Sequence, residues 1–466
     1  MYTCGPTVYD YAHIGNFRAF VFEDLLRRFL EFKDYKVKHV MNLTDVDDKT
    51  IAGAQREKMK LNDYTAKYIQ AFNEDLATLN CLPPTVQPRA TEKIKQMQDL
   101  IAKLIQKGMA YENGGSVYYR VSKFSGYGKL SKKKLEMNIA GASERVDSDE
   151  YESKEQVSDF VLWKGAKEGE DGLGAAWDSP WGKGRPGWHI ECSAMSIEEL
   201  GEQFDIHAGG EDLVFPHHEN EIAQSEAATE KKFVNYWLHC KFLLVDGKKM
   251  SKKDKNFYTL RDLLAKGYDP MAIRYALLST HYHTPLNFTL EGLKEASEVI
   301  KKLDDCYAPI NSQSSDAPKI KDSKIKSIRE VLESLHKGII EALADDLNIS
   351  KALASMLEGV ALVNTAFAEG DLSDADNLES VYIFFHQNDR IFGFDITSVD
   401  EVPVALFMKM RERSAVRHRI KEQNDKSLWK ESDRLRDEIQ AKGWLVKDGK
   451  PGELSILKKK RRVWDI

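Results

Sequence analysis

The 466-residue chain has few cysteines, five in all, an odd number spread over its whole length. Such usage does not fit the paired framework of a disulfide-stabilised secreted protein, so we expect reduced thiols. Long apolar runs are also missing, because no stretch approaches the roughly 18 residues that a membrane helix needs. No signal peptide opens the sequence. We therefore expect a soluble, cytoplasmic protein with no membrane contact.

The chain also has little net charge, −6, from 68 Lys and Arg against 74 Asp and Glu. That total hides an asymmetry, since residues 401–466 carry 18 basic and 11 acidic side chains, a net of +7, and the rest carries −13. The basic run 458–462 lies next to Trp464 and could bind phosphates while the indole stacks on a base. A run of this kind is also typical of a solvated tail. Hydrophobic residues at 42% exclude a largely disordered chain, and the length suggests about three domains.

The first 50 residues show a strand–helix–strand pattern. Residues 1–4 and 37–41 are candidate strands, and apolar residues between Ala19 and Leu30 recur at helical spacing. This unit favours a parallel α/β sheet, with ligands at the carboxyl ends of its strands. We expect the chain to begin within its first strand, so that a few preceding residues are missing.

Further elements follow from periodicity and from turn residues. The pattern predicts a helix over 62–79, a second helix that Thr91 caps and that ends near Gly108, and a hairpin turning at Asn113-Gly114-Gly115. Residues 165–187, rich in Gly, Trp and Pro, indicate a loop. Apolar residues return at helical spacing over 323–367, after a linker at 311–319 rich in Ser, Asp and Pro.

Three constellations could carry chemistry, and the first is the loop between the first strand and its helix. It contains His13, Gly15 and Asn16. The free N–H groups and the dipole of a helix start favour phosphate, and an imidazole can donate to phosphate oxygens as charge develops. Gly15 leaves room for an adenine ring. Alone, this pattern is more typical of a plain helix-start loop.

The second constellation is the run Lys248-Lys249-Met250-Ser251-Lys252-Lys253, after an apolar stretch and an Asp-Gly turn. Lysines on a loop can bind the terminal phosphates of a nucleotide and stabilise the transition state. In isolation an exposed basic loop is the simpler interpretation.

The third constellation is a set of possible metal ligands. His217 and Glu221 are four residues apart, so on a helix both would face one way. With Cys4 and Cys192 they would suit tetrahedral zinc. The spacing is not that of a zinc finger, and any one of these cysteines could instead be a buried structural thiol.

Taken together and in order, these segments resemble the class I aminoacyl-tRNA synthetases, whose signatures are His-Ile-Gly-x and, more than 200 residues later, Lys-Met-Ser-Lys. Within that class the chain is similar to the cysteinyl-tRNA synthetase family. The matching stretches are residues 2–10, 42–49, 89–92, 177–182, 184–195, 205–212 and 215–221. The resemblance is specific as far as about Phe288 and weakens beyond it.

The resemblance implies a Rossmann-like parallel-sheet catalytic domain with an inserted domain, followed by an α-helical domain and a small anticodon-binding domain. The implied divisions are 1–82 and 177–240 for the two catalytic halves, 83–176 for the inserted acceptor-arm domain, 241–310 for a stem-contact segment with the Lys-Met-Ser-Lys loop, 311–400 for the helical domain and 401–466 for the basic anticodon-binding domain. It also implies tRNA(Cys), ATP and L-cysteine as partners, and a monomer.

The resemblance further implies the site residues. Zinc, one ion per subunit, would be bound by Cys4, Cys192, His217 and Glu221, and cysteine by Thr44, Trp188 and His207. ATP, with Mg²⁺, would contact His13, Gly15, Gly209, Asp212 and Lys252, and the catalytic set would be His13, Asn16, Lys249 and Lys252. Two positions depart from the family pattern: Asn16 replaces a second histidine, and Lys253 replaces a serine.

Zinc would give such an enzyme its selectivity, because it ionises a thiol and binds the sulfur, which serine cannot match. No separate editing segment is therefore expected. Two alternatives stay open: a ligase that transfers activated cysteine to an amino sugar, which would lack the basic C-terminal module, and an inactive RNA-binding relative. The chain retains Cys4, Cys192, His217, Glu221 and Lys252, which argues against the latter.

Overall fold

The computed structural model describes residues 1–133, 154–254, 256–311, 328–369 and 375–397, and, of the C-terminal part, 406, 409, 412–413, 416–417, 419–420, 426–442, 444–447 and 456–459. The chain divides into two compact units, one of Met1–Leu260 with Tyr282–Phe288 and one of Arg261–His281 with Thr289–Ile466. Among the described residues, no helix combines the length and the apolar character required to cross a membrane.

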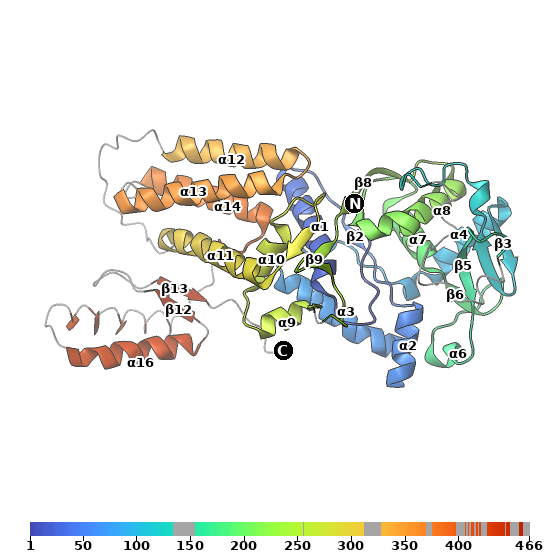
Figure 1. The fold of residues 1–466 in the computed structure, drawn as a ribbon, viewed down its shortest axis with the longest axis horizontal. Helices are drawn as coiled ribbons and strands as arrows, with labels where there is room; N and C mark the ends of the chain where they lie inside the picture. Colours follow the sequence, from blue (N-terminus) through green and yellow to red (C-terminus); the bar gives the residue numbers. More distant parts are fainter. Residues whose placement is uncertain are drawn as a thin grey trace. The chain divides into compact units, whose positions relative to one another are not determined.

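A four-stranded, fully parallel sheet forms the centre of the first unit (Figure 1). Its strands, in spatial order, are β2 (Val40–Met41), β1 (Tyr2–Thr3), β7 (Phe204–Gly210) and β8 (Val234–Cys240). Helix α1 (Ile14–Phe32) connects β1 to β2 and buries Phe17, Val21 and Leu25. The parallel sheet that the first 50 residues predict is confirmed. Its carboxyl edge is where Cys4 leaves β1 and where β7 ends in Gly209-Gly210.

The first two strands are shorter than the predicted 1–4 and 37–41. Their ladder joins Tyr2 to Val40 and Thr3 to Met41 only. After Thr3 the chain stays close to the residues that follow β2. The N–H of Gly5 donates to Oδ1 of Asn42 at 3.0 Å. A Cβ on Gly5 would overlap the backbone carbonyl of Asn42, so this close approach requires glycine.

An inserted antiparallel sheet follows, in the order β3 (Ala110–Asn113), β4 (Ser116–Tyr119), β5 (Phe160–Gly165), β6 (Gly184–Pro186). The predicted hairpin is confirmed, with Gly114 and Gly115 both at positive φ. The predicted loop 165–187 is wrong in part, because it contains the short helix α6 (Glu170–Leu173) and the edge strand β6. Arg185 of β6 is buried against Glu170 of α6, and this ion pair organises the segment.

The helix predicted to start at Thr91 begins later, as α4 (Ile94–Gln106) with Lys93 at its N-cap. Thr91 lies in a preceding 3₁₀ turn (Ala90–Glu92), and its hydroxyl donates to Oδ2 of Asp45 at 2.6 Å. The hydroxyl that the sequence pattern assigns to a helix cap therefore donates instead to the carboxylate of Asp45, which is distant in the sequence. The helix predicted over 62–79 is confirmed as α3 (Leu61–Thr78), preceded by α2 (Asp48–Glu57).

Two helices after the inserted sheet bring side chains to the carboxyl edge of the parallel sheet. They are α7 (Trp188–Leu200) and α8 (Glu219–Thr229), which pack against each other. A small sheet of β9 (Leu243–Val245), β10 (Lys248–Lys249) and β11 (Leu286–Phe288) then carries the basic loop that starts at Lys248.

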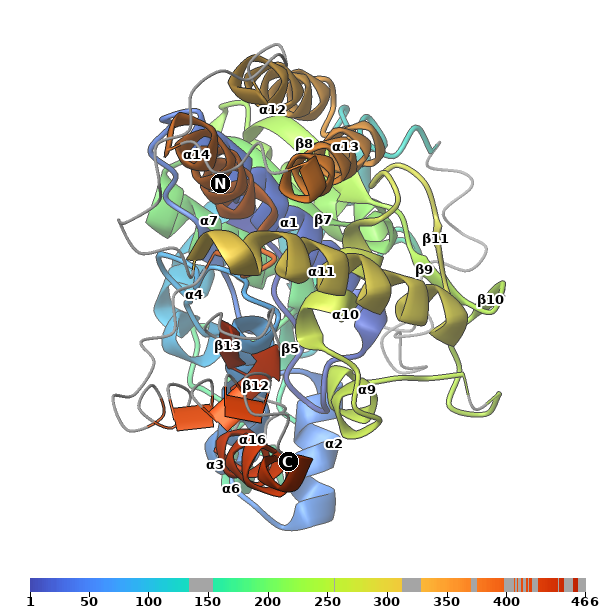
Figure 2. The ribbon, with the colours of Figure 1, turned by 90° about the vertical axis from the view of Figure 1, so that its left-hand side faces the viewer.

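The second unit is mainly helical. It contains α9 (Leu260–Ala265, whose first residue belongs to the first unit), α10 (Pro270–Leu278), α11 (Leu290–Asn311), α12 (Ile328–Ala344), α13 (Ile349–Glu369) and α14 (Ala375–Phe392). Figures 1 and 2 show α12, α13 and α14 running alongside one another. The helical structure predicted over 323–367 is confirmed, since α12 and α13 account for most of it. The predicted linker 311–319 lies outside the described residues except for its first.

The described C-terminal residues include α16 (Trp429–Gln440) and a hairpin of β12 (Trp444–Lys447) and β13 (Ile456–Lys459). Ile439 and Trp444 pack together with Leu406. Most of the basic run ending at Trp464 lies beyond the residues that the structure describes. An α/β chain with an inserted antiparallel sheet and a helical C-terminal region is thus confirmed.

Candidate metal centre and nucleotide site

Four potential metal ligands lie together at the carboxyl edge of the parallel sheet. Cys4 follows β1, Cys192 lies on α7, His217 lies in the turn Val214–His218 just before α8, and Glu221 lies in the first turn of α8. One donor atom from each falls within 4.8 Å of the others, and all four side chains are buried. The segments that the sequence separates by about 200 residues are therefore brought to one point by strand pairing and helix packing.

The distances within this group suit one small ion. Sγ of Cys4 lies 3.9 Å from Sγ of Cys192 and 3.9 Å from Oε1 of Glu221. Nε2 of His217 lies 3.1 Å from the same carboxylate oxygen. Ligands about 2.0–2.3 Å from a tetrahedral zinc ion lie roughly 3.3–3.8 Å from one another. Thiolate, imidazole and carboxylate donors are also those that zinc prefers, so the residues fit the ion.

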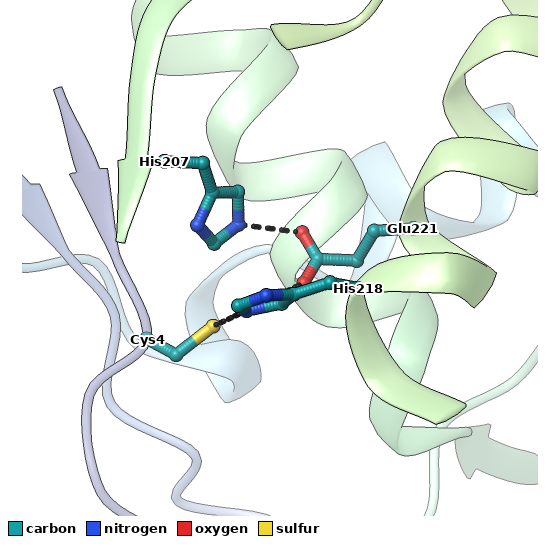
Figure 3. A group of neighbouring side chains, drawn as sticks. All are labelled: Cys4, His207, His218 and Glu221. Carbon is teal, nitrogen blue, oxygen red and sulfur yellow. Dashed lines mark hydrogen bonds and ion pairs between the residues drawn. The ribbon is translucent and has the colours of Figure 1, made fainter. Parts of the chain in front are cut away.

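A second set of four shares two of these ligands. It consists of Cys4, His207, His218 and Glu221, also within 4.8 Å (Figure 3). Nε2 of His218 lies 3.4 Å from Sγ of Cys4, and Nε2 of His207 lies 3.0 Å from Oε2 of Glu221. The sequence pattern implies His207 only as a pocket residue, and it includes His218 in the run of possible ligands 217–221 without assigning it to the ion. The adjacent pair His217-His218 is the sequence feature that points to this second set. Either imidazole can reach the carboxylate of Glu221, one helical turn further along the chain.

Burial dominates the electrostatics of this cluster. It raises the pKa of the Cys4 thiol and of the Glu221 carboxyl well above their usual ranges. It also lowers the pKa of His207 to about 3 and that of His218 well below its usual range. A divalent cation reverses this preference for the thiol and the carboxyl, because it favours the anionic donors, while the imidazoles stay neutral as ligands must.

Aromatic rings and imidazoles hold the cluster in place. Trp188 stacks on His217 with ring centroids 4.1 Å apart, and Nδ1 of His217 lies 3.0 Å from Nδ1 of His189. On the other side, His207 stacks on Trp237 at 4.6 Å. Outer contacts of this type orient ligand imidazoles and fix which nitrogen faces the ion.

A buried carboxylate ties the start of α8 to the inserted segment. Both oxygens of Glu219 accept hydrogen bonds, from the N–H of Gly128 and from the N–H of Ser131, each at 2.8 Å. Glu219 lies between His217 and Glu221 in the sequence. The position of these two ligands is therefore coupled to the backbone of residues 128–131.

The three residues expected to bind cysteine surround the cluster. Trp188 and His207 contact His217 and Glu221 as described. Thr44 lies beyond β2, fully buried, and its hydroxyl donates to Oε2 of Glu191 at 2.8 Å. Glu191 precedes Cys192 on α7 and was not singled out from the sequence.

The first-signature residues form the start of α1. His13 is the N-cap, and its Nδ1 accepts the N–H of Asn16 at 3.2 Å, while Oδ1 of Asn16 accepts the N–H of His13 at 3.1 Å. Asn16 thus completes a capping box with His13. The sequence pattern predicts a phosphate contact for Asn16 and not this structural role. Burial lowers the pKa of His13, with nearby Asp212 opposing this effect.

The basic loop lies against that helix start. A Cβ on Gly15 would come within 2.7 Å of Cε of Met250, so Gly15 leaves room for this loop. Nζ of Lys252 lies 2.9 Å from Oδ2 of Asp10 and 5.2 Å from the ring centroid of Phe257. Lys249 lies on β10, and its side chain is exposed. Gly209 is the last residue but one of β7, and a Cβ there would approach Leu213 and His218.

Comparison with known proteins shows to which protein family the chain belongs. Residues 1–298 match the family model described as tRNA synthetases class I (C) catalytic domain. The chain is 48% identical over 454 residues to a protein of Chlamydia caviae named cysteine--tRNA ligase, covering 97% of this chain and 92% of that protein. A protein of the same name from Brachyspira hyodysenteriae is 52% identical over 377 residues, 81% of this chain and 78% of the relative.

Solved structures support the fold at much lower identity. Methionyl-tRNA synthetase of Mycobacterium tuberculosis bound by methionyl-adenylate matches with a TM-score of 0.62 at 12% identity, covering 88% of this chain and 93% of that one. The catalytic-domain match over 298 residues, with close relatives along nearly the whole chain, means that this protein belongs to the cysteinyl-tRNA synthetase family of class I aminoacyl-tRNA synthetases.

Proposed function

We propose that this chain is an ATP-dependent cysteine--tRNA ligase, which activates L-cysteine and transfers it to the 3′ end of tRNA(Cys). The observation that carries the proposal is the buried group of Cys4, Cys192, His217 and Glu221 at the carboxyl edge of the parallel sheet. Thiolate, imidazole and carboxylate donors suit zinc, and zinc in turn favours a sulfur ligand such as the cysteine thiolate. The family relationship supports the same substrate.

The four residues would bind one Zn²⁺ per chain. Zinc held there offers a coordination position for the substrate sulfur and favours its thiolate form. Serine would be rejected, because its hydroxyl is harder to deprotonate and is a poorer ligand. Thr44, Trp188 and His207 would form the walls of the cysteine pocket. Metal coordination can exceed the ~1–3 kcal/mol that an apolar pocket gains from one small group.

The nucleotide would lie between the start of α1 and the basic loop. His13, Gly15, Gly209 and Asp212 would contact ATP, and Lys252 with Lys249 would bind its phosphates. Asn16 would act by fixing the cap at His13. Mg²⁺ would accompany ATP, bound largely by the phosphates.

The reaction would proceed in two steps without an enzyme nucleophile. The cysteine carboxylate attacks the α-phosphorus of ATP, so that an O–P bond forms, the bond to the β-phosphate bridge breaks and pyrophosphate leaves. A terminal ribose hydroxyl of the tRNA then attacks the acyl carbon, and AMP leaves as the ester forms. Positioning and charge stabilisation carry both steps.

The tRNA would contact several parts of the chain, which would act as a monomer. Residues 83–176 would bind the acceptor arm, 241–310 the stem and 401–466 the anticodon arm, with 311–400 as the helical domain between them. The net charge of +7 on residues 401–466 supports this placement.

The experiment that tests this function pairs zinc analysis of the purified protein with ATP–pyrophosphate exchange over all twenty amino acids. We expect about one zinc ion per chain and exchange with cysteine alone, followed by charging of tRNA. Adenylate formation with consumption of an amino sugar and uncharged tRNA would establish the alternative ligase. Absence of both zinc and exchange would leave an RNA-binding relative.

A further inference from the structure

Residues 127–133, which we call the docked segment, follow the inserted hairpin and are fixed against the start of α8. The hydroxyl of Tyr127 donates to Oδ1 of Asn220 at 2.5 Å. Two backbone N–H groups of the segment donate to the fully buried side chain of Glu219. Because a buried acceptor that loses its donors costs free energy, these contacts hold the docked segment in one position relative to α8.

The backbone of the docked segment is a tight turn that brings its end next to the metal centre. Gly128 has a φ of 88°, and a Cβ there would overlap the carbonyl oxygen of Lys133, so the turn requires glycine. Nζ of Lys133 lies 4.4 Å from the ring centroid of Phe215. Phe215 belongs to the turn Val214–His218, which carries His217. The docked segment therefore adjoins the stretch of chain that supplies two of the proposed zinc ligands.

The docked segment is basic. Residues 113–133 include five Lys and Arg and no Asp or Glu. Arg120 pairs with Glu155. Lys129 and Lys132 are exposed, and neither has a carboxylate partner within the part of the chain that the structure describes. A basic run is usually a solvated face, but here buried contacts fix the backbone that carries the two ammonium groups. Their place next to the site is thus specified, as well as their charge.

The chemistry of the docked segment suits phosphate. The N–H groups of Gly128 and Ser131 already donate to Glu219, so the segment offers a ligand its lysine side chains rather than a ring of backbone donors. A lysine ammonium is a point charge with three donors and no acceptor, which fits phosphate oxygens and does not select a base. We therefore look for a ligand with several phosphates.

The position of the docked segment favours tRNA over ATP as that ligand. The phosphates of ATP are proposed to lie with Lys252, whose Nζ is 2.9 Å from Oδ2 of Asp10, in the loop before α1. The docked segment contacts α8 and the turn before it instead. The 3′ end of the tRNA must reach the cysteine that the zinc ligands hold, so its sugar–phosphate backbone has to approach this part of the surface.

We propose that Lys129 and Lys132 bind backbone phosphates of the unpaired 3′ end of tRNA(Cys), an inference that rests on the proposed function. Because Glu219 fixes the docked segment on the stretch of chain that supplies His217 and Glu221, the tRNA end is held relative to the cysteine pocket. Contacts to phosphates contribute affinity and register and read no base.

The test measures the affinity of the full chain for intact tRNA(Cys) and for the same tRNA without its unpaired 3′ nucleotides, by fluorescence anisotropy over a range of salt concentrations. The double variant Lys129→Gln/Lys132→Gln keeps Lys133, which contacts Phe215. We expect it to weaken intact tRNA about 10- to 30-fold at about 0.1 M salt. The slope of log affinity against log salt should become shallower by about 1.4, since each single-strand phosphate contact contributes about 0.7. The truncated tRNA should bind the variant and the wild type within about twofold of each other.

Lys33→Gln/Lys36→Gln is the matched control, because it removes two exposed lysines beyond the C-terminal end of α1, the end remote from His13. It should leave the affinity for intact tRNA as in the wild type. Equal weakening by the two double variants, or no weakening by either, would overturn the proposal. Equal weakening of intact and truncated tRNA would also overturn it, since the lysines would then act elsewhere on the tRNA.

Pyrophosphate exchange separates the nucleotide from the tRNA. A raised KM for ATP in Lys129→Gln/Lys132→Gln would assign the two lysines to ATP and overturn the proposal, whereas a KM equal to that of the wild type supports it. A wild type that shows no cysteine-dependent exchange and does not bind tRNA would instead refute the proposed function.

Discussion

Nε2 of His217 lies 3.1 Å from Oε1 of Glu221, one helical turn further along the chain. His218 also approaches this oxygen, at 3.8 Å, with its other ring nitrogen 2.8 Å from Nε2 of His239. Two adjacent imidazoles thus compete for one ligand position. The set with His217 contains both thiols, whereas the set with His218 contains only one, and zinc favours the larger number of thiolates.

His217→Asn should therefore lower zinc affinity at least about 100-fold, and His218→Asn by no more than about tenfold, as for an outer contact. Competition with a chromogenic chelator measures both affinities. The opposite ranking of the two variants would assign the ligand position to His218.

Lys252→Ala should reduce the rate of cysteine-dependent pyrophosphate exchange about 10²- to 10³-fold, because it removes a positive charge proposed to act on the phosphates. Lys253→Ala, which removes the same charge at the next, exposed position, should stay within about threefold of wild type. Initial rates at saturating ATP measure both. Equal losses of exchange rate in the two variants would mean that the total positive charge of the loop matters and that the position of Lys252 does not.

Glu23→Gln should stabilise the protein at neutral pH by about 1–2 kcal/mol. Burial raises the pKa of Glu23 well above its usual range in the folded state. The stability that this difference provides is present below the unfolded-state pKa, near 4.5, and is lost as pH rises toward the folded-state value. Urea unfolding at pH 5 and pH 8 should show a gain that is larger at pH 8. A gain that is larger at pH 5 would contradict the sign.

Gly5→Ala should destabilise the protein by about 3 kcal/mol or more, because the added Cβ would overlap the backbone at Asn42 beside Cys4. Zinc should be lost as well, since Cys4 would shift. Gly172→Ala is the control, since its Cβ would meet no atom of the described residues within 4 Å. Thermal unfolding measures both, and a Gly5→Ala protein with wild-type stability and zinc content would show that the strand can move.

The sequence allowed the parallel sheet, the hairpin at Gly114 and the candidate ligands to be predicted, because each depends on local spacing or on a motif. The cap at Thr91 was wrong because Asp45, a distant residue, takes its hydroxyl. Glu191 could not be found for the same reason. Its partner Thr44 is 147 residues away in the chain, and only the fold shows that no donor among the described residues reaches its second carboxylate oxygen.

The ligand cluster has a consequence for how the protein is made. Cys4 is synthesised 217 residues before Glu221, and the inserted sheet is translated between them. The first thiol therefore exists long before the remaining donors, and a chain truncated within the inserted segment lacks Cys192, His217 and Glu221. The complete site therefore requires a chain that extends through β1, β2, β7 and Glu221, so that metal content reports whether the two separated parts of the first unit have come together.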